Sequence, residues 1–280
     1  MRVLVVGAGQ MGSGIAQVCA VAGNEVQLND VTANALAHGC AAIRRNLERS
    51  VEKGKISAAD SERSFQRITE LPSIEGSLQA DLAIEAVSES LDLKTRVLQA
   101  LDAALPPAAI LASNTSSLSI TVLGAVTKRA DRVIGMHFMN PVPLMRLVEL
   151  VRGIATSQAT FAFAKQFAEA LGKVAVEIND FPGFASNRIL MPMLNEAMFA
   201  NMEGVGSAEA IDTIMKLGMN HPMGPLELAD FIGLDTCLAI MQVLYDGFND
   251  PKYRPCPLLK KMVAAGYLGK KSGRGFYQYS

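Results

Sequence analysis

Residues 3–30 read VLVVGAGQMGSGIAQVCAVAGNEVQLND. The apolar, mostly β-branched run Val3–Val6 is typical of a strand that is buried on both faces of a parallel sheet. A glycine-rich turn, GAGQMG, and a helix-prone segment follow it, and a second strand-like run ends at Asp30. This order of strand, glycine turn, helix and strand predicts a βαβ unit, the building block of α/β sheets that bind dinucleotides.

The three glycines of the turn, spaced as GxGxxG, predict three different contacts. Gly7 allows the tight turn, Gly9 lets the backbone approach a pyrophosphate, and Gly12 lets the helix pack closely on the strand. Gln10 and Met11 lie at the helix N-terminus, where amide groups and a partial positive charge favour phosphates. A glycine-rich turn without a ligand is the alternative, and the complete βαβ context argues against it.

Asp30 ends the second predicted strand, where an acidic residue accepts hydrogen bonds from the ribose hydroxyls of adenosine. Its negative charge would repel the 2′-phosphate of NADP. The sequence therefore predicts a Rossmann-type domain that uses NAD as its cofactor.

The composition excludes several classes of protein. Half of the 280 residues are hydrophobic and 19% are charged, which is typical of a compact soluble protein. A net charge of −1 gives no general attraction to nucleic acids or anionic membranes. The four cysteines form no CxxC pair and no cluster with histidine, which argues against a disulfide framework or a metal site and favours the cytoplasm.

Beyond Asp30, helical and strand patterns alternate up to about residue 180, which predicts a doubly wound α/β sheet. A long helical stretch at about 33–67, broken near Gly54, replaces the short crossover expected after the second strand. NDFPGF marks a boundary between an NAD-binding domain at 1–180 and an all-helical domain at 181–280. Further strands are predicted at 66–71, 81–87, 109–113, 132–137 and 173–178, and a helix at 91–104.

The segment HFMNPVPLMRLVEL, residues 137–150, places a histidine and a glutamate on either side of two prolines. Pro141 and Pro143 rule out one continuous helix. If two antiparallel strands flank a turn centred near Pro143, His137 faces Glu149. Glu149 lies among apolar neighbours, where an unpaired carboxylate is costly, and the histidine across the turn is the partner that this register offers.

Six stretches carry a family likeness, and they are GAGQMGSGIAQ, SNTSSLSI, HFMNPVPLMRLVEL, DFPGFASNR, HPMGPLELADFIGLDT and GKKSGRGFY. Together they resemble the L-3-hydroxyacyl-CoA dehydrogenases, and among these the stand-alone bacterial 3-hydroxybutyryl-CoA dehydrogenases. The resemblance covers essentially the whole chain in order, and its histidine-to-glutamate motif is highly specific. No catalytic position departs from the pattern, and the helical stretch after Asp30 is the least distinctive part.

The resemblance implies the reversible oxidation of an L-3-hydroxyacyl-CoA to the 3-ketoacyl-CoA, with the hydride passing to NAD+. In such an enzyme His137 takes the hydroxyl proton, and Glu149 orients the imidazole and stabilises the imidazolium. Ser116 would hydrogen-bond the substrate oxygen near the nicotinamide, and Asn187 would hold the substrate from the second domain. The implied substrates are short, 3-hydroxybutyryl-CoA and acetoacetyl-CoA.

Four further positions match residues that the family places around its cofactor. Glu89 and Lys94 match positions near the nicotinamide ribose and the phosphates. Asn140 matches a neighbour of the cofactor and of the catalytic histidine. Lys271, in the C-terminal tail, matches a lysine near the cofactor, and a solvated charged tail is the alternative for it.

Arg45, Arg49 and Lys53 fall at i, i+4 and i+8 of the helix predicted after Asp30 and form one basic stripe. By spacing alone, the stripe reads as a solvated helix face. The family likeness favours a site for the phosphates of CoA, because Asn46 and Lys53 match positions that touch CoA. It leaves Arg45 and Arg49 open between the two interpretations.

The second domain is expected to close over the substrate and to form a dimer contact, as the helical domain of the family does. Residues 185–203, ASNRILMPMLNEAMFANME, are apolar on nearly every side, which requires burial by more than their own domain. We therefore expect a homodimer with an acyl-CoA substrate, and neither a nucleic-acid nor a membrane partner.

Two other functions fit parts of the sequence. The β-hydroxyacid dehydrogenases of the 6-phosphogluconate type share both kinds of domain but use a catalytic lysine, and no lysine lies near Asn187. A non-catalytic protein that binds NAD or acyl-CoA would not need His137 and Glu149. Both alternatives are weaker than an NAD-dependent oxidoreductase, and no metal is predicted.

Overall fold

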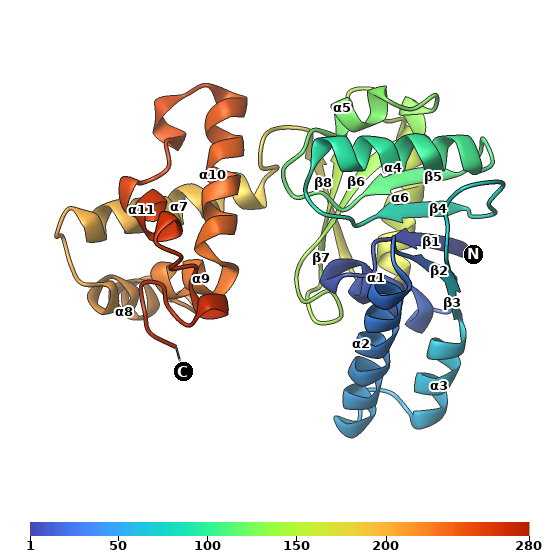
Figure 1. Ribbon diagram of the computed structural model, residues 1–280, viewed down its shortest axis with the longest axis horizontal. Helices are drawn as coiled ribbons and strands as arrows, with labels where there is room; N and C mark the ends of the chain where they lie inside the picture. The colour runs from blue at the N-terminus through green and yellow to red at the C-terminus, as the bar shows by residue number, and fades with distance from the viewer. Residues whose placement is uncertain (280) are drawn as a thin grey trace. The chain divides into compact units, whose positions relative to one another are not determined.

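One twisted sheet runs through the first part of the computed structural model, which describes residues 1–279 (Figure 1). Its strands are β1 (Arg2–Val6), β2 (Glu25–Asn29), β3 (Ile68–Leu71), β4 (Leu82–Glu85), β5 (Ile110–Ser113), β6 (Val133–Phe138), β7 (Leu147–Arg152) and β8 (Val174–Asn179). They are ordered β3-β2-β1-β4-β5-β6-β7-β8, and neighbours are parallel except for the antiparallel pair β6 and β7. The predicted Rossmann-type doubly wound sheet is confirmed, and the strand ends differ from the predicted ones by one or two residues.

Helices cover the sheet and connect its parallel strands. They are α1 (Gln10–Val21), α2 (Ala33–Glu52), α3 (Ala58–Gln66), α4 (Leu91–Ala104), α5 (Ile120–Ala125) and α6 (Gln158–Ala170). Between β2 and β3, α2 and α3 take the place of a short crossover, as the long helical stretch predicted. Five helices begin at a residue whose hydroxyl accepts a hydrogen bond from a backbone amide of the first turn, which satisfies a donor that the helix leaves unpaired. These caps are Thr32, Ser57, Ser90, Ser119 and Ser157.

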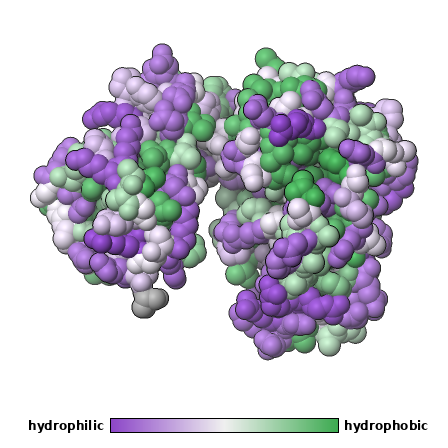
Figure 2. All heavy atoms as spheres, in the orientation of Figure 1, coloured by the Kyte–Doolittle hydropathy of each residue, from purple (hydrophilic) through white to green (hydrophobic). Residues whose placement is uncertain are grey.

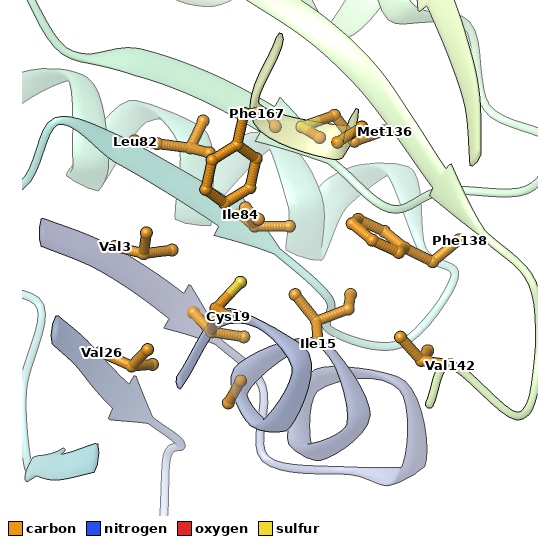
Figure 3. Close-up of a cluster of buried hydrophobic side chains, with 14 of the residues drawn as sticks. Val3, Ile15, Cys19, Val26, Leu82, Ile84, Met136, Phe138, Val142 and Phe167 are labelled. Carbon is orange, nitrogen blue, oxygen red and sulfur yellow. The ribbon is translucent and has the colours of Figure 1, made fainter. Parts of the chain in front are cut away.

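The core between helix and sheet also includes the turn after β6 (Figure 3). Ile15 of α1, Phe138 of β6 and Val142 of the turn belong to one buried cluster and are at most 2% exposed. Burying a side chain of this size stabilises a fold by about 1.5–3 kcal/mol relative to exposing it. The turn is therefore held by hydrophobic packing, and the strand that follows it starts from a fixed point.

The chain divides into two units, Met1–Asp180 and the residues from Phe181 onward. The described part of the second unit contains helices and no named strand, as the all-helical prediction states. Its α-helices are α7 (Ser186–Met202), α8 (Ala208–Gly218), α9 (Pro225–Ile232), α10 (Leu234–Phe248) and α11 (Pro257–Ala264). Within residues 1–279 no single helix is long and apolar enough to cross a membrane, and α9 with α10, which together have the length and composition, are bent by 98°.

Two buried carboxylates in the second unit hold its C-terminal tail. Asp212 is 1% exposed and accepts hydrogen bonds from the amides of Leu226 and Glu227 and from the hydroxyl of Tyr277. Asp230 is fully buried and accepts from the amide of Tyr277 and from the hydroxyl of Tyr279. Burial and the nearby Asp212 raise the pKa of the Tyr277 hydroxyl, so that it stays a donor.

Substitution of Tyr277→Phe tests this attachment of the tail. The change removes the 2.8 Å hydrogen bond to Asp212 and leaves that buried carboxylate with one donor fewer. We expect the free energy of unfolding to fall by about 1.5–3 kcal/mol, as for other hydrogen bonds to charged groups. Urea unfolding measures it. Tyr245→Phe, at a residue that is 36% exposed on α10, is the control and should change the value by less than about 0.5 kcal/mol.

Candidate active site

The glycine turn between β1 and α1 has the geometry of a phosphate-binding loop. Gly7 has a φ of +103°, which favours glycine. A Cβ atom on Gly12 would lie 1.7 Å from the carbonyl oxygen of Gly7, so α1 can approach the turn only without a side chain there. A Cβ atom on Gly9 would meet nothing within 4 Å. Gly9 therefore faces open space at the N-terminus of a helix, where amide donors favour an anion.

A cavity of about 500 Å³ adjoins this turn, and Asp30 lines it together with Gly7 and Gly9. The Asp30 carboxylate accepts hydrogen bonds from the amides of Ala8 and Val31, both at 2.7 Å, which fix its position at the end of β2. The remaining wall is largely apolar and includes Val31, Ile74, Leu93 and Val97. A carboxylate beside an apolar cavity and an open glycine turn fits the ribose, adenine and pyrophosphate of NAD.

His137 and Glu149 face each other on the antiparallel strands β6 and β7. The register pairs these two residues, which confirms the register predicted from the two prolines. Nδ1 of His137 lies 2.7 Å from Oε2 of Glu149, and the residues are 8% and 2% exposed. A carboxylate at this distance holds the proton of the imidazole on Nδ1. Any proton exchange with a substrate is thereby assigned to Nε2.

The turn that joins β6 and β7 is fixed on two sides. A Cβ atom on Gly14 of α1 would lie 2.9 Å from Cβ of Val142, so the turn rests directly on the helix backbone. Nζ of Lys173 donates hydrogen bonds to the carbonyl oxygens of Val142, at 2.5 Å, and of Met145, at 2.7 Å. Lys173 is 8% exposed, and desolvation lowers its pKa. Sequence reasoning missed Lys173, because its partners lie in a distant loop.

Ser116 lies in the loop that follows β5, at the carboxyl ends of the parallel strands. Oε1 of Glu89 accepts hydrogen bonds from the amides of Ser116 and Ser117, at 3.0 and 3.1 Å, and from the hydroxyls of Thr115 and Ser117. Desolvation would raise the pKa of Glu89, but the charge of Lys94 and the hydrogen bonds from Thr115 and Ser117 outweigh it and lower this pKa. Glu89 is therefore an ionised centre on which the loop is ordered.

The other predicted residues belong to the turn after β6, to α2 and its cap, and to the second unit. Asn140 is exposed in the turn after β6, and Asn46 and Lys53 belong to α2 and the residue that caps its end. Asn187, on α7, is 8% exposed, and Lys271 pairs with Asp235. Both of these residues belong to the second unit. Within residues 1–279, no group of three or more His, Cys, Asp or Glu side chains could hold a metal ion.

Comparison with known proteins gives one result for both units. Residues 2–181 match the model of the 3-hydroxyacyl-CoA dehydrogenase NAD-binding domain, and residues 183–279 match that of the C-terminal domain. The chain is 57% identical over 278 residues to the probable 3-hydroxybutyryl-CoA dehydrogenase of Bacillus subtilis, covering 99% of this chain and 97% of the relative. It is 47% identical to the 3-hydroxybutyryl-CoA dehydrogenase of Clostridioides difficile, with complete coverage of both. The crystal structure of (S)-3-hydroxybutyryl-CoA dehydrogenase from Ralstonia eutropha matches with a TM-score of 0.96, 51% identity, and coverage of 100% of this chain and 99% of that one.

Substitution of Gly9→Ala separates cofactor binding from folding. The backbone at Gly9 is extended, with φ −67° and ψ −170°, and the new methyl group meets no protein atom, so thermal stability should not change. The methyl group should displace the pyrophosphate and weaken NADH binding at least about tenfold, or ~1.4 kcal/mol, in a fluorescence titration. NADPH should bind the parent protein more weakly than NADH, because Asp30 would meet its 2′-phosphate.

The matched control is Gly12→Ala. It places a Cβ atom within 1.7 Å of the Gly7 carbonyl oxygen and should lower both stability and NADH affinity. A Gly9→Ala protein that binds NADH as tightly as the parent would contradict the assignment of the open space at Gly9 to the pyrophosphate.

Proposed function

The chain belongs to the 3-hydroxyacyl-CoA dehydrogenase family, and we propose that it interconverts (S)-3-hydroxybutyryl-CoA and acetoacetyl-CoA with NAD as cofactor. The observation that carries the proposal is the buried contact of 2.7 Å between His137 and Glu149, in the same sheet as β1, the strand that leads into the glycine turn. The match of both units to one family favours this function over that of the lysine-dependent β-hydroxyacid dehydrogenases. The names of the relatives support the short acyl chain.

The chain itself supplies the proton chemistry. In the direction of oxidation, Nε2 of His137 accepts the hydroxyl proton of the substrate while the carbon–hydrogen bond at carbon 3 breaks. The Glu149 carboxylate lies against Nδ1, where it keeps the imidazole in one tautomer and stabilises the imidazolium that forms. When bound, NAD+ would supply the acceptor for the hydride that leaves carbon 3. In the reverse direction His137 returns the proton to the oxygen.

Of the residues that would hold the cofactor, Gly7, Gly9 and Asp30 line the cavity beside the glycine turn. Gly7 and Gly9, with Gln10 and Met11 at the start of α1, would contact the pyrophosphate, and Gly12 lets α1 approach the turn closely enough for this. Asp30 would accept from the adenosine ribose, and Glu89 and Asn140 would lie near the nicotinamide half. The tail lysine Lys271 would approach the cofactor from the second unit, where it is paired with Asp235.

Substrate contacts are assigned to both units. Ser116 would hydrogen-bond the reacting oxygen, and Asn187 would hold the substrate from α7. Asn46 of α2 and Lys53, which caps the end of that helix, would touch CoA, and Arg45 and Arg49 lie on the same helix. Hydrophilic residues gather over the free ends of α2 and α3 (Figure 2).

Exposed apolar side chains support a homodimer, and free cysteine thiols support a cytoplasmic location. The second unit exposes several large apolar side chains on and next to α7 and α8, which supports a homodimer formed through this unit. They are Ile189 at 73%, Ile214 at 61%, Leu217 at 83% and Met219 at 62%. All four cysteines are free thiols, which supports the cytoplasm as the compartment, and the net charge of −1 supports neither a nucleic-acid nor a membrane partner.

Turnover of acetoacetyl-CoA with NADH, followed by the loss of NADH absorbance, tests the function. His137→Asn should lower kcat by about 10²–10⁴-fold, because the proton acceptor is lost. Glu149→Gln should lower kcat by about 10²-fold or more, because an amide cannot compensate the imidazolium charge. NADH affinity should stay within about threefold in both variants. A parent protein no faster than His137→Asn would refute the proposal and favour a non-catalytic binding protein.

Leu217→Lys tests the dimer. The side chain is 83% exposed, so the substitution should not affect folding of the protomer, but it would bury a charge in an apolar contact. We expect the parent to sediment as a dimer and the variant as a monomer at micromolar concentration. Ile154→Lys, at a residue that is 90% exposed in the first unit, is the control and should stay dimeric. A monomeric parent would rule out this surface as a dimer contact.

A further inference from the structure

A buried ion pair that sequence reasoning did not find lies behind the loop that carries Ser116. Nζ of Lys94, on α4, is 2.8 Å from Oε1 of Glu85, the last residue of β4. Glu85 is fully buried and Lys94 is 1% exposed. Replacing such a pair by apolar side chains is often neutral or stabilising, because the desolvation of two charges offsets their attraction. A contribution to the stability of the fold is therefore not a sufficient explanation for the presence of the Glu85–Lys94 ion pair.

The ammonium group of Lys94 is surrounded by oxygen atoms of the protein. It has three N–H groups. It donates hydrogen bonds to the Glu85 carboxylate at 2.8 Å and to the carbonyl oxygen of Val87 at 3.1 Å, and it forms an ion pair with Oε2 of Glu89 at 3.3 Å. A direct contact with the cofactor, which the family likeness implies for Lys94, would have to compete with these partners. The geometry instead points to an action of Lys94 through Glu89.

Glu89 connects this ion pair to the loop after β5. Its side chain is 37% exposed, and Lys94 contacts Oε2 while the donors of the loop converge on Oε1. Lys94 thus fixes one end of a carboxylate whose other end orders the backbone at Ser116 and Ser117. Without Lys94, the Glu89 carboxylate would be free to turn toward solvent and leave those amides.

Glu85 also reaches the start of the same loop. Its Oε2 accepts a hydrogen bond of 2.6 Å from the hydroxyl of Ser113, whose oxygen accepts from the amide of Thr115 at 3.2 Å. Its Oε1 accepts from the amide of Val87. The buried Glu85 carboxylate therefore links the carboxyl ends of the adjacent strands β4 and β5. It also binds the ammonium group of Lys94.

We propose that Glu85 and Lys94 are positioning residues that, through Glu89, fix the loop of Thr115–Ser117 so that Ser116 meets the substrate oxygen. This inference rests on the proposed function for the role of Ser116, but the ordering of the loop is a property of the protein without ligands. The carboxylates of Glu85 and Glu89 both contact the ammonium group of Lys94. The Glu89 carboxylate also accepts hydrogen bonds from hydroxyl and amide groups of the loop. Neither Glu85 nor Lys94 touches the reacting atoms.

The first measurement needs no activity. Lys94→Met keeps most of the length of the side chain and removes its charge. We expect backbone amides in residues 113–119 to exchange with deuterium about tenfold faster or more in the ligand-free variant, because about 1.4 kcal/mol of protection is lost. Unchanged exchange in this segment would overturn the proposal, whether or not the protein is a dehydrogenase.

The second measurement is a double-mutant cycle on acetoacetyl-CoA reduction. Lys94→Met should lower kcat by about 10–100-fold, with the KM for NADH and its affinity within about threefold. On a Ser116→Ala background the same substitution should cost less than about threefold, because the group that it positions is already absent. Equal losses in both backgrounds would show that Lys94 acts independently of Ser116, and a fall in NADH affinity would show a direct cofactor contact. Either result would overturn the proposal.

A second variant and a control exclude a general loss of folding. Ser117→Ala removes one loop donor to Glu89, 2.9 Å away, without changing any charge, and should lower kcat by about threefold to tenfold with the same dependence on Ser116. Asp102→Asn disturbs another buried ion pair of the first unit, with Arg129 at 2.6 Å, and should lower stability while leaving kcat unchanged. If Asp102→Asn reproduced the kinetic losses of Lys94→Met, the ion pair at Glu85 would be merely structural and the proposal would fail.

Discussion

Helix α1 can lie where it does only because glycines on its first turns have no side chains. At Gly12 the helix backbone closes on the turn after β1, and at Gly14 it closes on Val142 of the turn after β6. One helix therefore sets two distances at once, that of the phosphate-binding amides and that of the hairpin with His137. A single added methyl group at either position would move the two parts of the site relative to each other. The positions of the cofactor cavity and of His137 therefore both depend on helix α1.

The buried charged side chains of the first unit share one property, which is that each has a charged or polar partner within hydrogen-bond distance. Glu149 faces His137, and Glu85 faces Lys94, while Lys173 has only carbonyl oxygens as acceptors. Breaking such a contact from one side leaves a desolvated charge and costs about 3–5 kcal/mol, although the intact contact adds little to stability. These contacts therefore add little to the stability of the fold, but they raise the free energy of conformations in which they are broken. Glu85 lies at the end of β4, and Lys173 contacts the turn after β6, where hydrophobic packing alone would leave the backbone free to shift.

The sequence was most informative where a pattern is local. The GxGxxG turn follows directly on its strand, and the two prolines fix a hairpin whose alternation decides that His137 faces Glu149. The ends of the strands were predicted less accurately, because the last apolar residue of a run is not always the last residue that is hydrogen-bonded to the neighbouring strand. Glu85 and Asp230 were not predicted at all. Their partners Ser113 and Tyr277 are 28 and 47 residues away, and only the folded chain brings them together.

The burial of the His137–Glu149 pair has a consequence for proton transfer. With a neutral imidazole the pair carries one negative charge in a place that water scarcely reaches, and such a charge is expensive. When the imidazole receives a proton, the pair becomes neutral overall, and the attraction between its two halves is stronger than it would be in water. The Glu149 carboxylate thus lies at a fixed distance from the imidazolium that forms and compensates its charge. An exposed pair with the same 2.7 Å contact would lose this advantage to solvent screening, which accounts for a glutamate that is only 2% exposed on an otherwise apolar strand.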